Sequence, residues 1–205
     1  MKNSWTGGEA AIVVESVEEN LALSVRRGTP GAFERLMDRY EGSLFTYALG
    51  FLQNRQDAQE VVQDALVRAH RALTRQYDER RCASLALRPW LFRAVRNLCL
   101  NKRRPKGRAL ERPLEEYDDG RIGPFVRSRR SDFEQHEEAD VLRATLASLP
   151  VEARELIVLR FMEEMSYAEI ARTVGTTQAA LRAKVFRALK MLRESLEKKG
   201  VTHAV

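Results

Sequence analysis

The sequence predicts an all-α protein built from two small helical domains joined by a flexible linker. Apolar residues recur with a period near 3.6 along most of the 205 residues, and no runs alternate with a period of two. This periodicity stops between Pro105 and Asp132, where prolines and glycines lie among mixed charges, a composition typical of linkers. The expected parts are a mobile segment over 1–16, helical domains over 17–104 and 133–199, the linker over 105–132 and a tail over 200–205.

The N-terminal domain is expected to contain helices at residues 17–27, 30–52, 55–75 and 88–103. The first is predicted by its periodicity, and Pro30 suits the first turn of the second because its fixed φ matches a helix start. Pro89 suits the start of the fourth helix in the same way. Apolar positions at steps of three and four form core-facing stripes on the last two helices: Ala58, Val61, Val62, Ala65, Leu66, Ala69 and Leu73 on the third, and Leu91, Ala94, Val95 and Leu98 on the fourth.

The C-terminal domain is expected to contain helices at 134–148, 151–162, 166–173 and 177–196. Pro150 opens the second of these helices. Ser166 is a good N-cap for the third, with Glu169 at the capping-box position, and Gly175 supplies the permissive backbone that the following turn needs. The last helix carries an apolar stripe: Leu181, Val185, Ala188, Leu192 and Leu196.

A short helix, a glycine turn and a longer basic helix have the layout of a helix-turn-helix, whose second helix lies in the DNA major groove. The side opposite the apolar stripe of helix 177–196 carries Ala179, Ala183, Phe186, Arg187 and Lys190, with Arg182 and Arg193 at its margin. Small residues permit close approach to a groove, and arginines reach base edges or phosphates. Phe186 suits contact with a thymine methyl or packing against a neighbouring domain. The alternative interpretation is a pair of packed helices with a solvated basic face.

Composition narrows the class of function. The net charge of +6 and the pI near 9.6 favour a polyanionic partner. No apolar run is long enough to span a bilayer, and the N-terminus lacks a secretion signal, so a cytoplasmic protein is expected. The two cysteines, Cys82 and Cys99, are far apart and the histidines are scattered, which argues against a disulfide framework or a zinc site. Without a phosphate-binding loop or a nucleophile elbow, we expect no enzyme activity, metal or cofactor.

Two surfaces of the N-terminal domain are candidates for binding. Asp57, Glu60 and Asp64 form an acidic stripe that suits a cationic partner, or else a solvated helix face with acids near its N-terminus. On helix 88–103 a second side combines an aromatic, cations and an amide: Trp90, Arg93, Asn97 and Arg104. Such a surface suits the unstacked bases and backbone of a single strand. The preceding loop, Tyr77–Ala86, is either a pocket for an extruded base or an ordinary helix connection.

The combination of motifs resembles the sigma-70 family of bacterial RNA polymerase sigma factors, in its small two-domain extracytoplasmic-function (ECF) group. The N-terminal motifs are AFERL at 32–36, DAQEVVQD at 57–64 and WLFRAVRN at 90–97. The C-terminal motifs are Leu149-Pro150, LRF at 159–161 and SYAEIA at 166–171, continuing through Arg187-Ala188. They cover nearly everything from about residue 20 to 197, in the family's order and spacing.

The resemblance implies partners and roles. Residues Asp57, Glu60, Gln63 and Asp64 would bind the β′ coiled-coil of core RNA polymerase, and the C-terminal domain would meet its β flap. Residues Tyr77, Trp90, Arg93, Asn97 and Arg104 would open and recognise the −10 element as single-stranded DNA. Residues Thr177, Gln178, Arg182, Lys184, Phe186, Arg187 and Lys190 would recognise the −35 element of promoter DNA in the duplex major groove. The linker would run toward the RNA exit path, and an anti-sigma factor is an expected partner.

The sequence departs from the family pattern at several positions. Gln59 replaces an acidic residue, Leu87 an aromatic, and Pro89 is unusual beside Trp90. In the recognition helix, Ala180 replaces a common threonine and Ala183 a common serine, so the −35 sequence preference cannot be transferred from the family. Two other classes of function fit fewer of these features: a stand-alone helix-turn-helix regulator, and an RNA-binding protein that uses the same basic surfaces.

Overall fold

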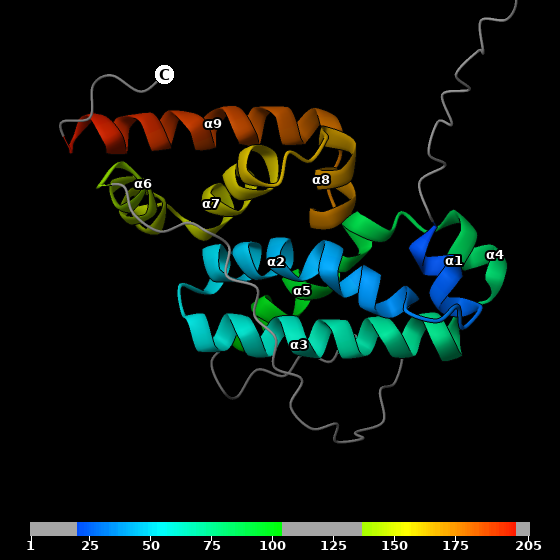
Figure 1. Ribbon diagram of the computed structural model, residues 1–205. Helices are drawn as coiled ribbons and strands as arrows, with labels where there is room; N and C mark the ends of the chain where they lie inside the picture. The colour runs from blue at the N-terminus through cyan, green and yellow to red at the C-terminus, as the bar shows by residue number, and fades with distance from the viewer. Residues whose placement is uncertain (1–19, 104–136, 200–205) are drawn as a thin grey trace, which may run out of the picture.

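The computed structural model describes residues 20–103 and 137–199 (Figure 1). The first range holds α1 (Leu21–Arg26), α2 (Ala32–Leu52), α3 (Arg55–Arg71), η1 (Ala72–Gln76), α4 (Glu79–Ser84) and α5 (Leu87–Arg103). The second holds α6 (Glu137–Ser148), α7 (Val151–Ile157), η2 (Val158–Met162), α8 (Tyr167–Val174) and α9 (Gln178–Glu197). We name these sets the N-terminal and C-terminal bundles. Within the described ranges every regular element is helical, which confirms the all-α prediction.

Several predicted features lie outside the described residues. They are the N-terminal segment 1–16, the linker 105–132, the tail 200–205 and Arg104. The predicted helices themselves agree with the structure to within a few residues. Two of them, 55–75 and 151–162, each consist of an α-helix whose last turn widens into a π-helix, η1 or η2.

The segment Tyr77–Ala86, predicted as a loop, contains the short helix α4. Asp78 caps it, because its Oδ1 accepts a hydrogen bond from the backbone N–H of Arg81 at 2.7 Å. Only Cys82 of this helix is buried. One buried position in six residues gives no periodic signal, which is why sequence reasoning missed the helix.

Local sequence fixes the helix-turn-helix as predicted. Ser166 and Glu169 form a complete capping box at the start of α8. Gly175 ends the helix in the left-handed conformation at φ 73°, which a residue with a Cβ adopts only with strain. Thr177 then caps α9, its side chain accepting from the backbone N–H of Ala180 at 3.3 Å. These caps define where α8 begins and ends and where α9 begins.

The two bundles pack directly against each other, a feature that was not among the sequence predictions. In Figure 1, α2 and α5 lie between α3 on one side and the C-terminal bundle on the other. One buried apolar cluster runs through both bundles, joining Leu44, Phe92 and Val95 to Val158 and Leu159. The described parts of the chain therefore share a core, with α7 against α2 and α8 against α5.

Candidate nucleic-acid interface

Helix α9 turns one face to the core and the opposite face to solvent. Leu181, Val185 and Ala188 of the predicted stripe are buried. Phe186, on the other side, is 71% exposed and so packs against no neighbouring bundle in this arrangement. All seven residues assigned to the −35 element are exposed: Thr177, Gln178, Arg182, Lys184, Phe186, Arg187 and Lys190. All seven are thus accessible along α9 and at its N-terminal end, with Arg182 and Lys184 on opposite flanks of the exposed side.

Neighbouring side chains contact two of the cations on this exposed side of α9. The guanidinium of Arg182 lies 5.7 Å from the centre of the Tyr167 ring on α8, an arrangement that favours cation–π attraction. Lys190 lies 3.9 Å from Glu194 one turn along the helix, an exposed pair that contributes little to stability. Most cations of α9 are therefore held by weak contacts that a polyanion can replace.

The residues assigned to the −10 element differ in accessibility. Arg93 is exposed, Trp90 and Asn97 are half-buried, and all three lie on α5. Tyr77 is only 9% exposed: its ring lies 5.9 Å from that of Trp90, and the guanidinium of Arg81 covers it at 3.7 Å. In this conformation the Tyr77 ring packs against Trp90, and its own surface is largely inaccessible to a DNA base.

The acidic residues of α3 carry internal partners that sequence reasoning missed. Lys102, from the last turn of α5, places its Nζ 3.0 Å from Asp57 and 2.6 Å from Glu60. The hydrogen bond that Lys102 donates to Glu60 is the main reason that the pKa of Lys102 is raised. Arg68 holds Asp64 by two hydrogen bonds, of 2.9 and 2.8 Å. The carboxylates thus form a partly neutralised face on which Glu60 is the most exposed.

A buried carboxylate joins the two bundles. Glu155 on α7 accepts a hydrogen bond from the Tyr47 hydroxyl of α2 at 2.6 Å and another from Arg96 Nε of α5 at 2.7 Å. Its side chain is 3% exposed. Burial, and then the negative charge of Glu155, raise the pKa of Tyr47 well above its usual range, so the phenol stays a donor. Arg154 adds a third link by donating to the backbone carbonyl of Gly50 at 3.0 Å.

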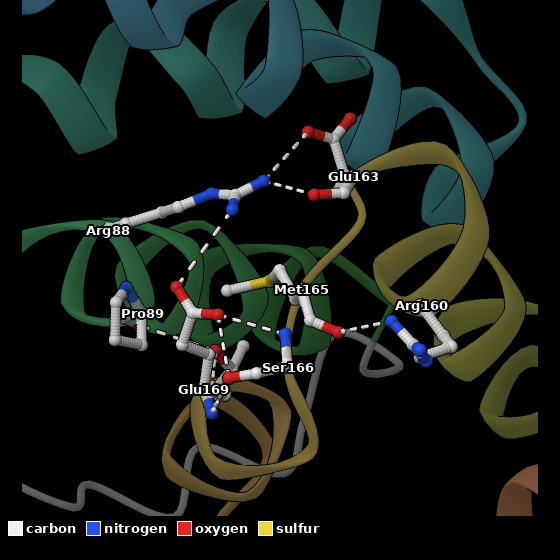
Figure 2. A network of polar contacts seen from close by, with 8 residues as sticks. Arg88, Pro89, Arg160, Glu163, Met165, Ser166 and Glu169 are labelled. Atoms are coloured by element: carbon white, nitrogen blue, oxygen red, sulfur yellow. Dashed lines mark hydrogen bonds and ion pairs between the residues drawn. The ribbon is translucent and has the colours of Figure 1, made fainter.

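A second group of contacts surrounds Arg88 at the start of α5 (Figure 2). Its guanidinium donates to the backbone carbonyl of Glu163 and lies 3.9 Å from the carboxylates of both Glu163 and Glu169. Burial raises the pKa of the Glu163 carboxyl, while its contacts with Ser43 and Arg88 oppose that rise. The Thr173 hydroxyl lies 3.5 Å from the Pro89 carbonyl, so α8 sits over the first turn of α5.

Comparison with protein families identifies the chain. The family model described as Sigma-70 region 2 matches residues 36–109, and that of Sigma-70 region 4 matches residues 139–192. The RNA polymerase sigma-H factor of Pseudomonas aeruginosa is 27% identical over 195 residues, covering 91% of this chain and 97% of that protein. The ECF RNA polymerase sigma-E factor of Escherichia coli is 28% identical over 190 residues, covering 89% and 93%.

The chain belongs to the sigma-70 family, in its extracytoplasmic-function group. It is therefore a sigma factor, a member of a family of non-enzymatic transcription initiation factors that direct RNA polymerase to promoters.

Solved structures agree with this assignment. The sigma factor superposes on CnrH, solved in complex with the cytosolic domain of CnrY, with a TM-score of 0.62 and 26% identity, covering 87% of this chain and 96% of that one. RpoE of Bartonella quintana, solved with the anti-sigma factor NepR, gives a TM-score of 0.61 at 23% identity, covering 82% and 98%, and supports the fold.

Over 20–103 and 137–199, no helix is both long and apolar enough to cross a membrane. In the same ranges no three side chains of histidine, cysteine, aspartate or glutamate are grouped to hold a metal ion. Both thiols are fully buried and unpaired, and burial raises the pKa of Cys99 to about 12.

The contacts between the bundles were absent from the sequence interpretation. One signal was available: Glu155 stands among Leu156, Ile157 and Val158, in a helix that is apolar on most sides. A carboxylate in such a place requires a buried partner. The sequence does not say which residue, because Tyr47 lies 108 positions away.

We predict that Tyr47→Phe lowers the free energy of unfolding of the sigma factor by about 1–3 kcal/mol, because Glu155 loses a buried donor. Urea unfolding followed by circular dichroism measures the change. Tyr40→Phe, in the same helix but only half-buried, is the matched control and should change it less. Equal effects of the two substitutions would contradict the importance of the Glu155 contact.

Proposed function

We propose that this sigma factor binds core RNA polymerase through α3, recognises the −35 element with α9 and captures the −10 element with α5. The observation that carries the proposal is the exposed face of α9, which follows a capped short helix and a left-handed glycine turn. A free basic helix in that setting has the geometry required to enter a major groove.

The chemistry of the α9 face suits a duplex. Arg182 and Arg187 are long, exposed donors that can pair with guanine edges or phosphates. Ala179 and Ala183 between them are small enough to allow close approach of the helix backbone. Phe186 adds an apolar contact of the kind that a thymine methyl accepts. The face thus combines positioning contacts with base recognition.

The chemistry of α5 suits a single strand. The indole of Trp90 is half-exposed, with Tyr77 behind it, and provides a platform on which a base can stack. Arg93, one turn further along, supplies positive charge for the backbone, and Asn97 supplies an amide for a base edge. We propose that strand opening is driven by capture of these bases together with polymerase contacts, since no catalytic step is needed.

Docking on polymerase is assigned to the exposed side of α3. Asp57, Glu60 and Asp64 suit the cationic side chains of a coiled-coil partner, and Gln63 is exposed among them. Lys102 and Arg68 hold these carboxylates through partly exposed ion pairs. Such pairs contribute little, so a partner arginine can compete for the same oxygens. The β flap is the proposed contact of the C-terminal bundle.

We further propose that an anti-sigma factor regulates the protein and that both act in the cytoplasm, where polymerase and promoters are. The similarity to RpoE, solved with the anti-sigma factor NepR, supports this. Affinity purification of the tagged factor from its native host should recover a second protein besides polymerase, in a complex that excludes polymerase. Recovery of polymerase alone would count against this partner.

If α5 captures the −10 element and α9 recognises the −35 element, substitutions on the two helices should impair different steps. Mapped transcription start sites after overexpression supply the promoter, and run-off transcription with core polymerase should then start there. Arg93→Ala should abolish promoter opening, seen by permanganate reactivity, yet leave binding to a −35 duplex unchanged. Arg187→Ala should weaken duplex binding by about 1–3 kcal/mol, the usual contribution of such an arginine. A lack of added initiation, with no core association, would refute the assignment.

If α3 docks on core polymerase, reversing a charge on its exposed side should weaken that binding. Glu60→Lys places a cation where the cationic partner binds and should weaken core polymerase association by about tenfold or more, because like charges repel across an interface. Fluorescence anisotropy of the labelled factor with core enzyme measures this. Glu34→Lys, the same change at an exposed site near the start of α2, is the control. If both variants bind core equally, the docking site lies elsewhere.

A further inference from the structure

A small hollow lies within the docking side of α3. Its volume is about 420 Å³, and its lining comes from α3 and α5: Glu60, Val61, Asp64, Leu98 and Lys102. Val61 and Leu98 are buried and form an apolar floor, whereas the side chains of Glu60 and Asp64 are well exposed at the rim. An apolar floor with an anionic rim suits one long side chain that has an apolar stem and a cationic end.

The chain itself supplies such a side chain. Lys102 comes from the last turn of α5, 42 positions after Glu60, and its side chain is only 27% exposed. Its Nζ lies 3.0 Å from Oδ1 of Asp57 and 2.6 Å from Oε2 of Glu60. Two of the carboxylates assigned to the partner are therefore already engaged by a cation of the same molecule.

The fold gains little from this engagement. Helices α3 and α5 are joined by buried apolar side chains, among them Val62, Val95 and Leu98, which belong to one core cluster. Ion pairs as exposed as those of Lys102 contribute little to stability. The hydrogen bonds to Glu60 and Asp57 raise the pKa of Lys102, so its ammonium stays charged at neutral pH. The main effect of Lys102 is thus on the charge that α3 presents.

We propose that Lys102 is an internal competitor at the docking side of α3, and that core polymerase binds there through an arginine that displaces it from Asp57 and Glu60. The inference rests on the proposed docking function of α3. An arginine suits the exchange because its planar guanidinium can bridge two carboxylate groups, whereas Lys102 offers a single ammonium.

Competition lowers the affinity for polymerase by either of two routes. If Lys102 moves away when the partner binds, its two ion pairs are lost and the new contacts only replace them. If Lys102 stays, two cations lie side by side and repel each other. Replacement of Lys102 by a neutral residue removes both costs. Lys102 therefore limits the affinity of the factor for core polymerase.

The test measures the affinity of full-length variants for core polymerase by fluorescence anisotropy. Lys102→Met keeps a long apolar stem without the charge and should bind about fivefold more tightly at low salt, the scale of an exposed ion pair. This gain should shrink at high salt, which screens exposed charges. Lys102→Arg keeps the charge and should bind like the wild type.

A matched control removes the same charge elsewhere. Arg75→Met lies on η1, exposed and about 20 Å further along the helix from Glu60, and should leave core binding unchanged. The gain from Lys102→Met should also vanish when Asp57→Asn and Glu60→Gln are present, because Lys102 then has no carboxylate to occupy. A gain that persists in that background overturns the competitor role.

Urea unfolding of Lys102→Met should match that of the wild type, which shows that the variant is folded. Unchanged or weaker core binding by the folded variant overturns the inference. The Glu60→Lys variant separates this result from failure of the docking assignment. If Glu60→Lys weakens core binding while Lys102→Met does not tighten it, only the competitor role is wrong. If neither variant changes core binding, the docking site itself lies elsewhere.

Discussion

The position of the C-terminal bundle depends on one buried carboxylate. Glu155 is almost inaccessible to water, and an ion in such a place is tolerated only with good partners. Its partners come from two different helices of the other bundle, the Tyr47 phenol and the Arg96 guanidinium. These contacts fix α7 against both α2 and α5. The placement of α8 over the start of α5, and with it the Arg88 contacts, follows from that orientation.

The same constraint explains how charge is distributed over the molecule. The chain carries a net charge of +6, yet many of its carboxylates are engaged within the fold. Glu155 and Glu163 lie between the bundles, Glu169 both caps α8 and faces Arg88, and Lys102 neutralises part of α3. The cations of α9 have only weak partners by comparison. The helix with the geometry suited to a duplex therefore presents cations that have only weak internal partners.

Local signals made part of this structure predictable. Ser166, Glu169 and Gly175 act within one or two turns of themselves, so their caps and turn followed from the sequence, as did the exposure of Phe186. Helix α4 was missed because it buries one side chain. The contacts between the bundles were missed for a different reason: Tyr47 and Glu155 are partners only in three dimensions. The burial of Tyr77 beneath Arg81 likewise depends on a packing arrangement that periodicity does not encode.

The burial of both thiols has a consequence for the signals to which the protein responds. Oxidants and electrophiles react with thiolates that solvent can reach, whereas Cys82 and Cys99 are inaccessible and Cys99 is held protonated at physiological pH. The two thiols of the folded chain are thus protected from peroxide and from disulfide exchange. If its regulon responds to such a stress, another molecule must detect the oxidant. The factor then acts downstream, by directing RNA polymerase to the promoters of that regulon.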